Sequence, residues 1–132
     1  MSSRLVRRPV ALALLLAACS GGSVLAPQFQ PQVANNPDNF QFQATGVTNV
    51  TQVLTYRWSC SSGTASVNPA TTTTSGSVSM VIKDGAGATV YSGNVPPSGT
   101  FNTSPAGSVG MWTIELTFTD YSGTINFRVQ KF

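Results

Sequence analysis

From about residue 39 onward, apolar and polar residues alternate one by one. A period of two predicts β-strands with one buried face. The segment 111–119 shows it most clearly, with Trp112, Ile114, Leu116 and Phe118 on one face and Thr113, Glu115, Thr117 and Thr119 on the other. The same alternation runs through 40–45, 54–60, 78–83 and 125–130.

Turn-forming residues separate these segments. Asp84-Gly85-Ala86-Gly87 lies between two β patterns and predicts a hairpin turn. Asp120-Tyr121-Ser122-Gly123 predicts a second reversal, which would make 111–119 and 125–129 an antiparallel hairpin. Short strands are expected at 65–68, before Pro69, and at 100–102, whereas the Thr-rich segment 71–77 is expected to be a loop.

These patterns predict an all-β fold, because no long window after the first residues has helical periodicity. Seven to nine strands with turns every eight to twelve residues are typical of an antiparallel two-sheet β-sandwich, Ig-like or jelly-roll. The expected core comprises Phe42, Leu54, Tyr56, Trp58, Val78, Met80, Ile82, Trp112, Ile114, Leu116, Phe118, Ile125, Phe127 and Val129.

The first residues follow a different pattern. Arg4, Arg7 and Arg8 precede an unbroken apolar stretch over 10–18. A membrane-spanning helix needs about 20 apolar residues, so this stretch has instead the length of a signal-peptide core. An ordinary signal peptide with a chance cysteine and a buried N-terminal helix are the alternatives.

Leu16-Ala17-Ala18-Cys19 resembles the lipobox of bacterial lipoproteins. The resemblance implies diacylglycerol on the sulfur of Cys19, cleavage just before it, and acylation of the new amine. Ser20 is not the aspartate associated with inner-membrane retention, which favours the outer membrane. Two or three acyl chains hold a protein firmly on a bilayer. The expected division is a signal peptide over 1–18, a lipidated cysteine and flexible tether over 19–38, and a β-sandwich over 39–132. The alternative is that Phe29 docks on the domain as part of a first edge strand.

The formal charge of +3 is a property of the leader. After Cys19 the basic residues Arg57, Lys83, Arg128 and Lys131 are matched in number by the acidic residues Asp38, Asp84, Glu115 and Asp120. No basic stripe remains to follow a phosphate backbone, which excludes nucleic acid as an expected partner.

The stretches 78–93 and 110–130 also resemble small secreted sandwich modules, of which the pre-peptidase C-terminal type is one. The shared features are a hairpin at Asp84-Gly85, then Gly110-Met111-Trp112 opening a strand, then a closing hairpin. The acidic cluster that binds calcium in that family is missing, so the resemblance implies a fold and no metal.

The candidate chemistry is sparse. The chain has no histidine, which removes Ser-His-Asp and Cys-His catalysis and imidazole zinc sites. Glu115 is expected to be an exposed residue pairing across strands, and Asp84 and Asp120 to cap turns. We therefore expect no enzyme, no metal and no cofactor.

Cys60 is expected to be a small buried hydrophobe beside Trp58, with a disulfide to Cys19 or an intermolecular bond as alternatives. Tyr91 and Tyr121 flank turns and are candidates for stacking on sugar rings, or for packing over a sheet end. Trp58 and Trp112 fall on apolar faces and are expected in the core.

The sequence thus predicts a lipid-anchored bacterial envelope protein whose sandwich is a non-catalytic binding or structural module. Its partners would be the membrane, through the anchor, and envelope proteins or glycans. A carbohydrate-binding module and an accessory subunit docking another envelope protein by its edge strand are the alternatives.

Overall fold

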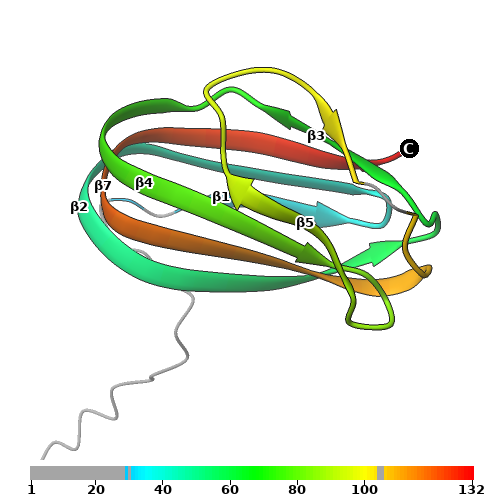
Figure 1. Ribbon diagram of the computed structural model, residues 1–132. Helices are drawn as coiled ribbons and strands as arrows, with labels where there is room; N and C mark the ends of the chain where they lie inside the picture. The colour runs from blue at the N-terminus through cyan, green and yellow to red at the C-terminus, as the bar shows by residue number, and fades with distance from the viewer. Residues whose placement is uncertain (1–28, 30, 104–105) are drawn as a thin grey trace, which may run out of the picture.

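A computed structural model describes residue 29 and residues 31–103 and 106–132, and nearly all of its regular structure is β (Figure 1). The strands are β1 (Gln32–Asn36), β2 (Asn39–Cys60), β3 (Ala65–Pro69), β4 (Thr72–Lys83), β5 (Thr89–Asn94), β6 (Phe101–Asn102) and β7 (Gly110–Lys131). All strand pairs are antiparallel.

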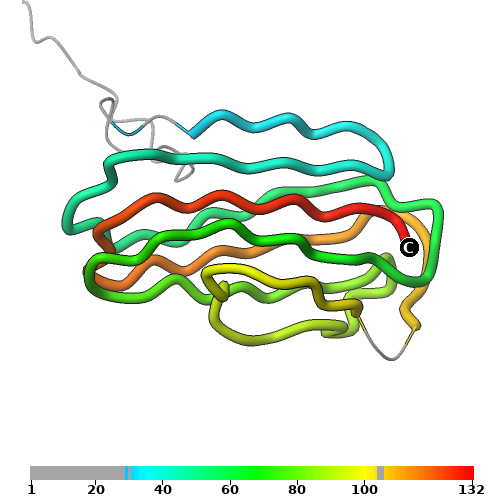
Figure 2. The backbone as a smooth tube through the Cα atoms, turned by 90° about the horizontal axis from the view of Figure 1, so that it is seen from above, coloured from blue at the N-terminus to red at the C-terminus, as the bar shows by residue number. Residues whose placement is uncertain are grey.

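The expected antiparallel two-layer sandwich is confirmed, and both layers come from one continuous seven-stranded sheet. The first layer is ordered β1, the first half of β2, the second half of β7, β3 and β6. The second layer contains the second half of β2, the first half of β7, β4 and β5. The 22-residue strands β2 and β7 therefore run through both layers (Figures 1 and 2).

The crossing between layers is a bend shared by β2, β4 and β7, where these strands curve around at the left of Figure 1. β-Bulges interrupt the register of β2 on β7 between Ala44 and Gln52, and that of β4 on β7 between Thr73 and Ser77. Left-handed backbone conformations gather here, at Gly46, Asn49, Gly76, Asp120 and Gly123. Bulges bend a strand and increase its local twist, which lets each long strand fold over on itself.

The core lies between the two layers and follows the predicted alternation. Trp58 and Trp112 are fully buried and meet edge to face, with ring centroids 5.9 Å apart. In the first layer Phe42 stacks on Phe127 at 5.4 Å. Every residue of the expected core is buried except Tyr56, which is half-buried and packs against the others. Full burial of one large apolar side chain contributes about 1.5–3 kcal/mol.

Two local predictions are wrong. The chain does fold back near 120–123, but 111–119 and 125–129 do not form a hairpin, because 110–131 is one bent strand whose two halves pair with β2 and β4 or β3 instead of with each other (Figure 1). The Thr-rich segment 71–77 is not a loop, since β4 begins at Thr72. Its β-branched threonines suit an extended backbone.

The expected tether also ends earlier than predicted. β1 lies within 19–38 and pairs with β2 from Gln32 to Asn36, so the sandwich includes residues before 39. Phe29 is half-buried against the core, in agreement with the alternative that it docks on the domain beside a first edge strand. The expected signal peptide and Cys19 lie outside the described residues.

The short strand at 65–68 and the turn at 84–87 are confirmed. Among the residues that the structure describes, no helix is long and apolar enough to cross a membrane.

We predict that the bend tolerates a side chain at Gly46 but not at Gly76. Both glycines have positive φ, of 62° and 71°. A methyl group at Gly46 would meet open space, whereas one at Gly76 would collide with the carbonyl oxygens of Thr119 and Asp120. Gly46→Ala should cost about 1 kcal/mol of unfolding free energy, the usual left-handed penalty. Gly76→Ala should cost about 3 kcal/mol or more.

Urea denaturation of the two variants measures this difference. Equal losses of stability would contradict the close packing of β4 on β7 at the bend.

Candidate functional site

Tyr121, one of the two tyrosines expected at a ligand site, is fully buried. Its ring meets Phe118 edge to face at 5.7 Å, and its hydroxyl donates to the Thr72 carbonyl at 3.3 Å. Asp120, with φ of 45°, adds a bulge residue that turns Tyr121 inward, three positions after buried Phe118 instead of two. Full burial leaves no ring face for a sugar, so of the two alternatives for Tyr121 the structure shows packing and not a ligand contact.

Tyr91 is half-buried on β5, the last strand of the second layer. Its ring stacks on Phe101 with centroids 4.2 Å apart and planes 15° apart. The hydroxyl donates to the Asn94 carbonyl at 3.3 Å, and partial burial raises the pKa of the phenol. The stack joins β5 of the second layer to β6 of the first, so one face of the Tyr91 ring is already occupied. The structure does not bring Tyr91 and Tyr121 together.

Asp84 caps the β4–β5 turn, as expected, and also fastens a distant loop. Its Oδ1 accepts hydrogen bonds from the Ala86 and Ala88 amides, each at 2.9 Å, and its Oδ2 accepts one from the Ser108 amide at 2.9 Å. These amides, that of Ser108 foremost, hold the pKa of the carboxyl below its usual range. Asp84 is a structural residue that joins this turn to the segment before β7.

Asp120 and Glu115 lie apart from one another. Asp120 accepts a hydrogen bond from the Thr51 hydroxyl at the bend, at 3.2 Å. Glu115 lies on the outer face of the second layer, opposite Thr55 and Val81. No group of three or more His, Cys, Asp or Glu residues capable of holding a metal occurs within the described ranges.

Cys60 is buried and not in a disulfide, as expected for a small core residue. Its thiol donates to the Ser62 carbonyl at 3.3 Å. Burial raises the pKa of the thiol and so disfavours the reactive thiolate. The other cysteine, Cys19, lies outside the described residues.

The β1–β2 turn covers one edge of the second layer. The Asn35 side chain donates to the Arg57 carbonyl at 2.8 Å, and the Asp38 amide donates to the Ser59 carbonyl at 2.9 Å. Trp58 Nε1 donates to the Asn36 carbonyl at 3.0 Å. The first two of these contacts use main-chain carbonyls of β2 that could otherwise pair with another strand. At the end of the first layer, β1 offers an exposed edge of five residues.

The outer face of the first layer is a continuous polar surface rich in amides. Because Phe40, Phe42, Ile125, Phe127 and Val129 point into the core, their neighbours in sequence point outward. We call this surface the amide face, formed by Gln32, Gln41, Gln43, Asn68, Asn126, Arg128 and Gln130.

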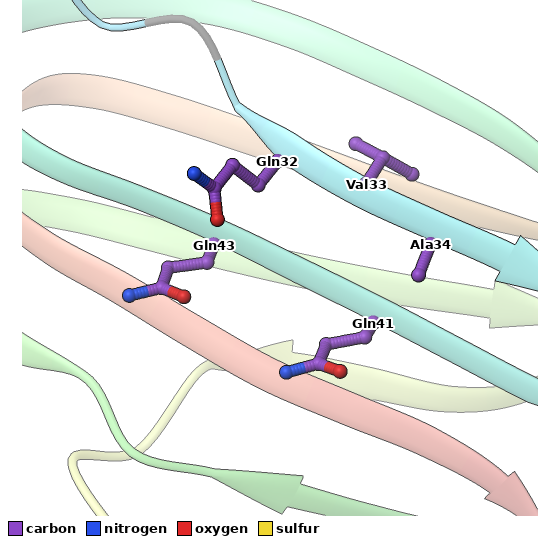
Figure 3. A pocket seen from close by; sticks show the side chains of 5 residues that line it. All are labelled: Gln32, Val33, Ala34, Gln41 and Gln43. Carbon is purple, nitrogen blue, oxygen red and sulfur yellow. The ribbon is translucent and has the colours of Figure 1, made fainter.

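Strand register places these side chains in rows. Gln43 lies opposite both Gln32 and Asn126, and Arg128 lies between Gln41 and Asn68. Figure 3 shows Gln32, Gln41 and Gln43 around one shallow pocket, with Val33 on the other side of β1. A second pocket is lined by Gln41, Asn68, Ala70, Asn126, Arg128 and Gln130.

The amide face can form many hydrogen bonds with a ligand. Each Asn or Gln side chain offers both a donor and an acceptor, and Arg offers only donors. Sequence reasoning missed this surface. Its signal is the alternation of amides with large apolar residues in 40–43 and 125–130.

In comparisons with known proteins, no family model and no curated protein matches this chain.

We predict that Asp84→Asn destabilises the sandwich in a pH-dependent way. A carboxyl whose pKa is lowered on folding adds stability above its unfolded pKa, near 3.8, and this contribution is lost as the pH falls through the lower folded value. The melting temperature of Asp84→Asn should therefore lie below that of the wild type at pH 7. The gap should narrow below about pH 4.

Glu115→Gln is the matched control, because Glu115 lies on an outer face and no hydrogen bond to its carboxylate is found in the described part of the chain. Its melting temperature should differ little from that of the wild type. A gap for Asp84→Asn that stays constant from pH 7 to pH 3 would contradict the role given to the carboxylate.

Proposed function

We propose that the chain is a lipid-anchored protein of the bacterial envelope, and that its sandwich is a non-catalytic module that binds glycans on the amide face. The anchor rests on Arg4, Arg7, Arg8, the apolar stretch 10–18 and Leu16-Ala17-Ala18-Cys19. The single observation that carries the binding role is the cluster of amides on the first layer, held at fixed spacings by strand pairing.

Spacing and rigidity support a glycan as the ligand. Neighbouring strands are about 4.8 Å apart and outward residues on one strand about 6.8 Å apart, so the amides form a grid comparable in scale to a sugar ring. Vicinal hydroxyls both donate and accept hydrogen bonds, as amides do. Half-burial already limits the side-chain rotamers of Gln41, Gln43, Asn68, Asn126 and Gln130. Binding would therefore cost less side-chain entropy than it would at fully exposed residues.

The edges of the sheet give less support to the alternative of a docking subunit. Strand addition gains affinity from a row of main-chain hydrogen bonds. The exposed edges of β1 and β5 have only five and six residues, and Asn35 and Asp38 occupy part of the edge formed by the second half of β2. The amide face spans four strands and is the broader surface.

Replacing Cys19 tests the anchor. We expect Cys19→Ser to move the protein from the detergent phase to the aqueous phase in detergent partitioning, because the acyl chains supply most of its membrane affinity, at about 0.8 kcal/mol per buried methylene. Cys60→Ser is the control, since a buried thiol is not a lipid attachment site, and this variant should partition like the wild type. Unchanged partitioning of Cys19→Ser would overturn the lipoprotein proposal.

Paired substitutions test the binding surface. The double variant Gln41→Ala, Asn126→Ala removes two amides of the amide face and should weaken binding to glycans, detected on a glycan array, by about tenfold or more. Thr55→Ala, Thr117→Ala removes two outward hydroxyls from the second layer and should leave binding unchanged. Melting temperatures of both variants establish that the fold is intact.

Two results would contradict the proposal for the amide face. The wild type would bind no glycan, or the two double variants would bind equally well.

A further inference from the structure

Arg128 is the one charged side chain of the amide face. It is exposed, and no ion pair or side-chain hydrogen bond involves its guanidinium among the described residues. The acidic residues of the chain number four and all lie elsewhere. The Asp38 carboxylate accepts hydrogen bonds from Ser61 and lies 3.8 Å from Lys131 Nζ. The Asp84 carboxylate accepts hydrogen bonds from backbone amides. Asp120 lies at the bend, and Glu115 lies on the second layer.

The immediate neighbours of Arg128 do not neutralise it. Register places Gln41 on one side and Asn68 on the other, and both are uncharged. The Thr100 hydroxyl donates to Asn68 Oδ1 at 2.8 Å, which uses the acceptor of that amide and leaves its NH₂ group for another partner. Arg128 also lines a pocket, together with Gln41, Asn68, Ala70, Asn126 and Gln130.

A planar guanidinium with amide donors beside it matches the geometry of a carboxylate. Arg binds a carboxylate through two parallel N–H···O bonds, which are stronger than bonds between neutral groups. One isolated cation cannot follow a polyphosphate chain, whose binding rests on many ion pairs. The flanking amides would then bind hydroxyls on the sugar that carries the carboxylate, or on the sugars next to it.

We propose that the ligand of the amide face is an acidic glycan, and that Arg128 binds the carboxylate of a uronic acid unit. This inference rests on the proposed glycan-binding function and names its substrate class. Asn68 positions a donor beside Arg128, and Gln41, Asn126 and Gln130 receive the hydroxyl groups.

Matched polysaccharides separate this inference from the broader proposal. The full chain, purified in detergent, is tested by affinity electrophoresis against polygalacturonate, alginate and hyaluronan, each also in its methyl-esterified form. We expect retardation by at least one of these uronate polymers, and binding to its ester weaker by about tenfold or more, because esterification removes the charge and one acceptor oxygen. Binding to the uronate should weaken as salt rises.

Variants at two arginines assign the charge to its site. Arg128→Gln should bind the uronate polymer about as weakly as the wild type binds the ester. Arg128→Lys keeps the charge but loses the two parallel N–H donors of the guanidinium, so its affinity for the uronate polymer should lie between those of the wild type and Arg128→Gln. Arg57→Gln removes an exposed arginine from the second layer and should bind like the wild type. Equal loss in Arg57→Gln and Arg128→Gln would mean binding through net charge and would overturn the inference.

The remaining outcomes are distinct. Equal binding to uronates and their esters would overturn the acidic-glycan inference and leave the glycan-binding function standing. No binding to any of the polymers, together with no binding on the glycan array, would overturn both.

Discussion

The structure depends on the shared bend of β2, β4 and β7. A 22-residue strand is far longer than one layer of a small sandwich needs, and its apolar face can be buried only if the strand turns over on itself. At the bend, the Asp120 amide donates to the Thr51 hydroxyl at 2.9 Å, and the Asn49 amide donates to the Ser122 hydroxyl at 3.0 Å. These bonds replace main-chain pairs lost at the bulges. The ring of Tyr121 fills the inside of the bend, and without it the two layers would enclose a void.

The bend also determines which residues can meet a ligand. It divides each long strand into two halves with opposite outward directions, so Gln41 belongs to one outer face and Thr55 to the other. The outer face of the first layer gains Gln41 and Gln43 from β2 and Asn126, Arg128 and Gln130 from β7, side by side. The outer face of the second layer carries mainly hydroxyls with Arg57, Lys83 and Glu115. Two chemically different surfaces thus arise from the same two strands.

The alternation of residues was sufficient to predict the β fold and almost the whole core, because a period of two specifies which side chains face inward whatever the order of the strands. It could not predict the strand pairing on either side of 120–123. Asp120 and Gly123 have positive φ, as in a turn, and the chain does fold back there, but through bulges within one long strand instead of a hairpin loop. The difference lies in long-range pairing with β2 and β4. For the same reason Tyr121 was expected at a surface and lies in the core, and the amide face, which needs the register of four strands, was not predicted.

Nuclear magnetic resonance can show residue by residue whether this protein meets its ligand on the amide face. The side-chain NH₂ signals of Asn and Gln and the Nε–H signals of Arg can each be followed during titration of the full chain in detergent with uronate oligosaccharides. We expect the signals of Gln41, Asn68, Asn126, Arg128 and Gln130 to shift together, and the Arg57 signal to stay in place. Shifts confined to Arg57 and its neighbours on the second layer, or no shifts on the amide face at saturating ligand, would contradict ligand binding on the amide face.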